Sequence, residues 1–136
     1  MNGGGAATVL RLVAGGRAGE REAAIAAALE AGRRSAVILE GLPDAGSGLR
    51  EALARAAPAD ADPAADVVHL APACLCCAGN LVLRVSLNRV LRRRPERLFI
   101  GLADPEHLEQ LRQWLGGAPY ESWLRVGADL APLRGA

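Results

Sequence analysis

Short apolar stretches alternate along the chain with longer stretches whose apolar residues recur at helical spacing. A short apolar stretch bounded by turn-forming residues is typical of a buried β-strand. The first such stretch runs directly into Ala14-Gly15-Gly16, which predicts a tight turn after it. We expect strands at residues 7–13, 35–40, 66–70 and 97–103, and a fifth within the sequence SWLRVG, residues 122–127.

The intervening segments favour helices because they are rich in strong helix formers or carry an amphipathic pattern. Asn80 and Asp104 are suited to the N-cap position, and Pro105 to the first helical position after it. Pro95 should end the third helix. The expected helices are residues 20–31, 49–57, 80–94 and 104–117.

Strands and helices alternate over the whole sequence, which predicts an α/β domain. We expect a parallel sheet of four to five strands, joined by right-handed crossovers, with helices on both faces. The length of the chain fits a single domain spanning residues 1–136, with a connector at 58–65 and a C-terminal tail at 118–136.

All three cysteines, Cys74, Cys76 and Cys77, follow the expected strand 66–70 directly. Ligand sites of parallel sheets lie beyond the carboxyl ends of the strands, so the thiols should lie at a functional edge. A helix N-terminus favours thiolate over thiol, and thiolates select zinc and other thiophilic ions. Three thiolates would supply most of a tetrahedral zinc site and leave one position open.

The open position has several candidate ligands, namely His69, Glu40, His107 or a water molecule. His69 is equally suited to the core, and His107 to the surface of its helix. Two further roles are open to the thiols themselves. One is that of small hydrophobic residues buried in the core. The other is redox chemistry, although the spacing differs from Cys-x-x-Cys. Metal binding is favoured because three cysteines fall within four positions.

Composition excludes some partners. The formal net charge is +1 and aromatic residues are few, so no general attraction to nucleic acid or to membranes is expected. Arginine concentrates in RVLRRRPER, residues 89–97, where we expect a solvated face that complements the helix dipole. Asp60, Asp62 and Asp66 are expected to be solvated linker residues. Without a membrane-length apolar run or a basic signal-like start, the sequence predicts a cytoplasmic protein.

The cysteine motif CLCC, followed by a helix and then by RPERLFIGLADP, resembles the nucleotide domain of the CobW-type (G3E) metallochaperone GTPases. Cys74, Cys76 and Cys77 match the family's metal motif, and Gly-Leu-Ala-Asp-Pro at 101–105 matches a later one. The strand order matches from residue 7 to residue 117. The resemblance implies a P-loop NTPase-like three-layer sandwich, GTP-dependent handling of zinc, cobalt or a similar ion, and delivery to a client protein.

The phosphate loop departs from the family pattern. A P-loop ends in Gly-Lys-Ser/Thr, in which the lysine neutralises phosphate and the hydroxyl holds magnesium. At the corresponding positions Gly19 is followed by Glu20 and Arg21, and the chain contains no lysine. Two like charges 4 Å apart repel by about 4 kcal/mol at an effective dielectric of 20, so GTP is not expected to bind. The glycines of this degenerate phosphate loop are Gly15, Gly16 and Gly19, which form either a small-anion cradle or a simple turn.

Three hypotheses follow. The leading one is a non-catalytic protein that binds zinc or another thiophilic divalent metal and handles it without nucleotide. The first alternative is an active GTPase in which Arg17 or Arg21 contacts the phosphates. The second is a pseudo-GTPase that acts as an interaction partner. The expected partners are a client metalloprotein, a complete CobW-family protein or a second copy of the chain, with no membrane and no nucleic acid.

Overall fold

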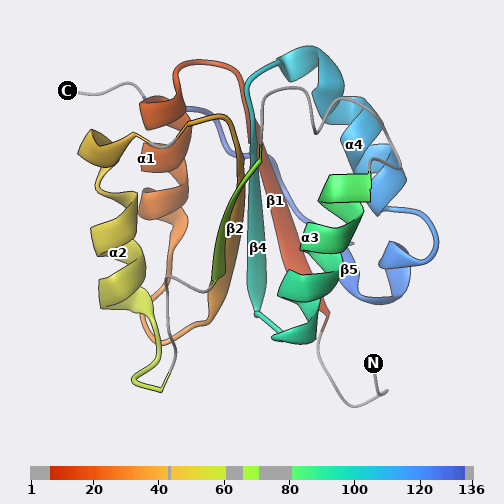
Figure 1. Cartoon of the computed structure of the whole chain (residues 1–136), viewed down its shortest axis with the longest axis horizontal. Helices are drawn as coiled ribbons and strands as arrows, with labels where there is room; N and C mark the ends of the chain where they lie inside the picture. Colours follow the sequence, from red (N-terminus) through yellow and green to blue (C-terminus); the bar gives the residue numbers. More distant parts are fainter. Residues whose placement is uncertain (1–6, 43, 61–65, 71–80, 134–136) are drawn as a thin grey trace.

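The computed structural model describes residues 7–42, 44–60, 66–70 and 81–133. Five parallel strands form one sheet within them, in the order β3-β2-β4-β1-β5 (Figure 1). The predicted α/β class with a parallel sheet is therefore confirmed. The strands are β1 Thr8–Ala14, β2 Ser35–Glu40, β3 Val67–Leu70, β4 Arg97–Leu102 and β5 Leu124–Val126.

The helices lie close to their expected positions. They are α1 Ala18–Ala28, α2 Leu49–Ala56, α3 Leu81–Arg92 and α4 Leu108–Leu115. Asp104 acts as a cap, as predicted, but its carboxylate accepts from Glu106 N–H and caps a 3₁₀ turn, Pro105–His107, that precedes α4. Among the described residues, no helix has the length and apolar character needed to cross a membrane.

The winding of the chain explains the layers. From β1 through β2 to β3 the chain moves in one direction across the sheet, and α1 and α2 cover one face. It then reverses to reach β4 and β5, so right-handed crossovers place α3 and α4 on the other face (Figure 1). The result is a three-layer sandwich, an arrangement consistent with that of P-loop NTPases.

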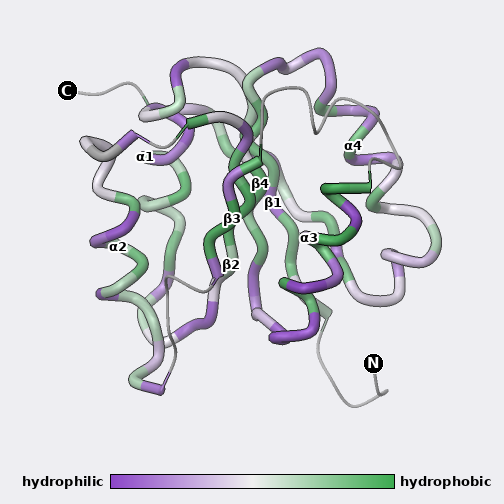
Figure 2. Tube along the Cα trace, viewed as in Figure 1, coloured by the Kyte–Doolittle hydropathy of each residue, from purple (hydrophilic) through white to green (hydrophobic). Residues whose placement is uncertain are grey.

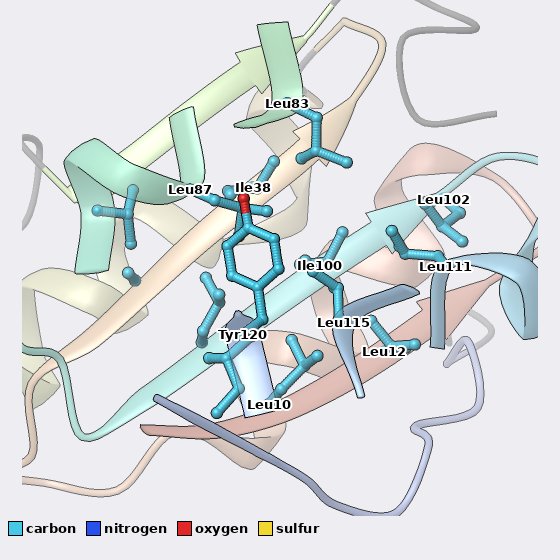
Figure 3. Close-up of a cluster of buried hydrophobic side chains, with 14 of the residues drawn as sticks. Leu10, Leu12, Ile38, Leu83, Leu87, Ile100, Leu102, Leu111, Leu115 and Tyr120 are labelled. Carbon is cyan, nitrogen blue, oxygen red and sulfur yellow. The ribbon is translucent and has the colours of Figure 1, made fainter. Parts of the chain in front are cut away.

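The core is aliphatic, and green apolar segments line the sheet in the interior of Figure 2. On the α3 and α4 face, the ring of Tyr120 lies among leucine and isoleucine side chains (Figure 3). Trp114 and Trp123 meet this ring edge-on, at centroid distances of 5.2 and 5.9 Å. The two tryptophans therefore pack around the C-terminal end of the core.

Asp66 corrects one expectation, because it is not a solvated linker residue. Its side chain is only 3% exposed and lies just before β3. One carboxylate oxygen accepts from Arg93 Nε at 2.5 Å, and the other lies 3.7 Å from Arg34 Nε. The carboxylate thus ties the start of β3 to the end of α3 and to the segment that enters β2.

We predict that Asp66→Ala lowers the free energy of unfolding by about 2–3 kcal/mol, because it leaves two half-buried guanidinium groups without their anion. Chemical denaturation of wild type and variant measures this loss. Asp60→Ala, which removes an exposed carboxylate from the same connector, is the matched control and should change stability by less than about 0.5 kcal/mol. Equal effects of the two substitutions would contradict a clamping role for Asp66.

Candidate functional site

At the carboxyl edge of the sheet, three pairs of neighbouring strands send their connections to opposite faces and so form switch points. The connections that leave β1 and β2 pass to the face of α1 and α2, whereas those that leave β3 and β4 pass to the face of α3 and α4. Ligands of open α/β sheets bind at such switch points. The pairs are β3–β2, β2–β4 and β4–β1.

The switch point between β4 and β1 is closed by contacts between the turns that follow these two strands. Gly15 N–H donates to the carbonyl of Leu102 at 3.1 Å. Gly15 has a φ of +87°, and a Cβ at this position would lie 3.8 Å from Cγ of Pro105. The turn after β1 therefore packs directly against the turn after β4.

The switch point between β2 and β4 is bridged by Glu40, the last residue of β2. Its side chain is buried, and Oε1 accepts from Ala103 N–H at 2.8 Å. This hydrogen bond links the ends of the two strands. One carboxylate oxygen of this candidate metal ligand is thus already used within the fold.

The degenerate phosphate loop is filled by its own side chains. Glu20 Oε1 accepts from Arg17 N–H at 2.7 Å, so its carboxylate lies where the helix N-terminus would attract an anion. The same oxygen lies 2.8 Å from the place a Cβ of Gly16 would take. This cap also explains why α1 begins at Ala18 and not at residue 20 as expected.

Arg21 is buried beneath this loop. Its Nη1 donates to the carbonyl oxygens of Gly15 at 2.9 Å and Gly16 at 2.7 Å. Burial lowers the pKa of the guanidinium, and the nearby carboxylates of Glu40, Glu22 and Glu20 oppose that shift. Arg21 is thus held as the internal counter-ion of an acidic cluster, and its donors face the loop backbone.

Two acidic residues between α1 and loop 41–48 were not singled out from the sequence. Glu22 is buried and accepts from Asp44 N–H at 2.9 Å and from the Ser47 hydroxyl at 2.7 Å. Asp44 in turn fills the space beside Gly19, where a Cβ would collide with its carboxylate. Gly19 is therefore explained by a close contact within the protein. No local motif signals these contacts, because the partners come from separate segments.

The C-terminal tail reaches the same loop. Gly127 N–H and Leu130 N–H donate to carbonyl oxygens of β1, at 2.7 and 2.8 Å. Leu133 N–H then donates to the carbonyl of Glu20 at 3.0 Å, and Pro132 lies against Gly16. Residues 127–133 of the tail thus run along β1 and reach the degenerate phosphate loop.

The third switch point lies between β3 and β2, and the cysteine segment follows β3 in the sequence. Cys74, Cys76 and Cys77 lie outside the described residues, which begin again at the start of α3. Within the described part of the chain, no group of three or more His, Cys, Asp or Glu side chains is arranged to hold a metal ion.

The two candidate fourth ligands on strands lie on opposite faces of the sheet. His69 is paired in register with Leu39, and Glu40 with Leu70. Because side chains alternate along a strand, Glu40 belongs to the face covered by α3, and the exposed His69 to the other. His107 lies farther away in the sheet order, after β4, with Nδ1 4.0 Å from Asp104 Oδ2.

We predict that Arg21→Met lowers the free energy of unfolding by about 2–4 kcal/mol, because it strips two carbonyls of their donor and removes a positive charge that interacts with three nearby carboxylates. Arg17→Met is the matched control, since Arg17 is exposed, and should cost less than about 0.5 kcal/mol. Urea unfolding of both variants measures the difference. An Arg21 variant as stable as the control would show that the loop does not depend on this guanidinium.

Comparison with known proteins adds no family to this geometry. No protein-family model, curated protein or solved structure matches the chain.

Proposed function

We propose that this protein binds a thiophilic divalent metal, zinc above all, through the thiolates of Cys74, Cys76 and Cys77, and handles it without nucleotide. The observation that carries the proposal is the placement of the cysteine motif. It follows directly after β3, whose carboxyl end lies at a switch point of the sheet. The other two switch points are closed by contacts of Gly15 with Pro105 and of Glu40 with Ala103.

The arrangement also favours Glu40 over His69 as the fourth protein ligand. Glu40 lies on the sheet face toward which the chain leaves β3 for α3, whereas His69 lies on the opposite face. A buried carboxylate beside three thiolates would complete a four-coordinate site of the kind zinc adopts. Its hydrogen bond from Ala103 N–H would then orient the carboxylate, as outer hydrogen bonds do at metal sites.

The residues of the degenerate phosphate loop do not fit a magnesium–GTP complex. The position of the phosphate-binding lysine is a carboxylate that accepts from Arg17 N–H, and the position of the magnesium-binding hydroxyl is a buried guanidinium. A triphosphate would have to displace the Glu20 carboxylate and pass Pro132. The resemblance to the CobW-type family therefore supports metal handling here, and the GTP-dependent step has no counterpart.

A role as an interaction partner is the second candidate, and one surface favours it. At the start of α3, next to the cysteine segment, Leu81, Val82 and Val85 are exposed by 69, 50 and 50%. Neighbouring exposed apolar residues are typical of docking surfaces. A client protein that receives the metal would meet this surface beside the thiols.

We predict that the protein, purified without a metal-binding tag, contains about one zinc ion per chain, and that replacing all three cysteines by serine abolishes this content. Elemental analysis by mass spectrometry measures it. Ala73→Ser/Ala78→Ser is the matched control, because it adds hydroxyls to the same segment and keeps the thiols. Equal metal content in wild type and the triple serine variant would refute the proposal.

We further predict that titration with a fluorescent GTP analogue shows no saturable binding that depends on magnesium, because the carboxylate of Glu20 occupies the anion position. Titrations with magnesium and with EDTA isolate the magnesium-dependent component. The Glu20→Gln variant removes the charge and tests whether repulsion alone prevents binding. Magnesium-dependent saturation in the wild-type protein would favour the GTPase alternative, with the exposed Arg17 as its phosphate contact.

A further inference from the structure

The amino edge of the sheet, opposite the carboxyl ends of the strands, contains a cavity of about 850 Å³. It is bounded by the first residues of β1 and β4, the end of α3 and residues of β5. Its volume lies within the range of small-molecule sites. The turn from α3 into β4, a hydrophilic stretch at the lower edge of Figure 2, forms one wall. This cavity is separate from the proposed metal site and from the degenerate phosphate loop.

Five arginines line the cavity, and two of them are neutralised within the protein. Arg33 pairs with Glu30 at 2.8 Å and with Glu96 at 3.0 Å, and Arg97 pairs with Glu30 at 2.5 Å. Glu96 is the one acidic lining residue of this cavity, and its second oxygen accepts from Arg34 N–H.

The other three arginines keep their charge unbalanced. Arg92, Arg94 and Arg125 are exposed, and none of them forms an ion pair within the described residues. The cavity therefore carries a surplus of three positive charges. Residues 1–6, which precede its lining residue Ala7, contain no acidic side chain to balance them.

Arg94 also adopts a backbone conformation that suits glycine better. Its φ is +53°, and it is the one non-glycine residue with positive φ in the described part of the chain. It follows the end of α3, and its N–H donates to the carbonyl of Leu91, at a helix-end position where glycine is usual. Residues with a strained backbone cluster at functional sites, so the position of Arg94 at the cavity points to a function of its side chain.

Most of the other lining residues are apolar, namely Ala7, Val9, Leu91, Pro95 and Trp123, and two are polar, Thr8 and Asn88. The indole ring of Trp123 is held in place by its edge-on contact with Tyr120. Guanidinium groups match phosphate in geometry and charge, and an indole face suits a flat apolar group.

We propose that this cavity binds an organic phosphate of about mononucleotide size, with the phosphate held by Arg92, Arg94 and Arg125 and the flat apolar body against Trp123. Such binding needs no magnesium and no contact with the degenerate phosphate loop.

The test uses the full-length protein with Trp114→Phe, which leaves Trp123 as the single tryptophan. Adenosine 5′-monophosphate, adenosine and inorganic phosphate are titrated in EDTA, with tryptophan fluorescence and calorimetry as readouts. We expect saturable binding of the nucleotide that exceeds binding of adenosine or of phosphate alone. Arg92→Gln/Arg94→Gln/Arg125→Gln should weaken it by at least about 100-fold, since each charged contact contributes about tenfold.

The matched control is Arg50→Gln/Arg55→Gln/Arg89→Gln, which removes the same charge from exposed arginines outside the cavity and should leave affinity unchanged. Arg94→Gly separates binding from folding, because glycine suits the positive φ. It should keep or raise the melting temperature while it weakens binding about tenfold. No saturable nucleotide binding in the parent protein, or equal losses in both triple variants, would overturn the proposal. Tighter binding of a short single-stranded RNA than of the mononucleotide would overturn it in favour of a nucleic-acid surface.

Discussion

The Arg21 guanidinium determines what the first turn of this fold can do. In a phosphate-binding loop, backbone N–H groups converge on an anion and leave the carbonyls to other partners. Here Arg21 draws the carbonyls of Gly15 and Gly16 toward the protein interior, and Glu20 covers Arg17 N–H from outside. These polar groups of the loop are therefore already hydrogen-bonded to side chains of the same segment. An incoming triphosphate would gain little from it and would face the carboxylates that surround Arg21.

Contacts within the protein also close two of the switch points at the carboxyl edge of the sheet. Interleaved strand order gives this small sheet three switch points, each a potential ligand crevice. Pro105 closes one against Gly15, and the Glu40 hydrogen bond to Ala103 N–H closes the next. If the protein had only lost its ligand, these switch points would be expected to remain open and polar. The remaining switch point involves β3, which the only thiols of the chain follow in the sequence, and this is why the proposed function rests on them.

Sequence patterns predicted the parts of the fold that depend on local signals. The strand 35–40 is apolar over most of its length because it lies between two neighbours, with helices on both faces, and all six of its residues are buried. Contacts between distant segments were not predictable in this way. Asp66 looked like one acidic residue of a polar connector, and only the fold brings Arg93 and Arg34 to it. The cysteine motif was evident from spacing alone, whereas the closure of the neighbouring switch points depends on contacts between segments far apart in the sequence.

The arginines at the other edge show how a local interpretation can be correct and incomplete. Arg89 and Arg92 lie in the last turn of α3, where positive charge complements the helix dipole, as the sequence suggested. That interpretation does not extend to Arg94, which lies beyond the helix with a positive φ, or to Arg125, which lies on β5. These two residues come from segments far apart in the sequence and meet the lining of one cavity together with Arg92. Among the described residues, the buried carboxylates of Glu22 and Glu40 lie near the carboxyl ends of strands, whereas three arginines that form no ion pair line the cavity at the amino ends. A parallel sheet keeps these two edges apart, so the proposed metal site and the proposed phosphate site would lie at opposite edges, and the charge of one would not neutralise the other.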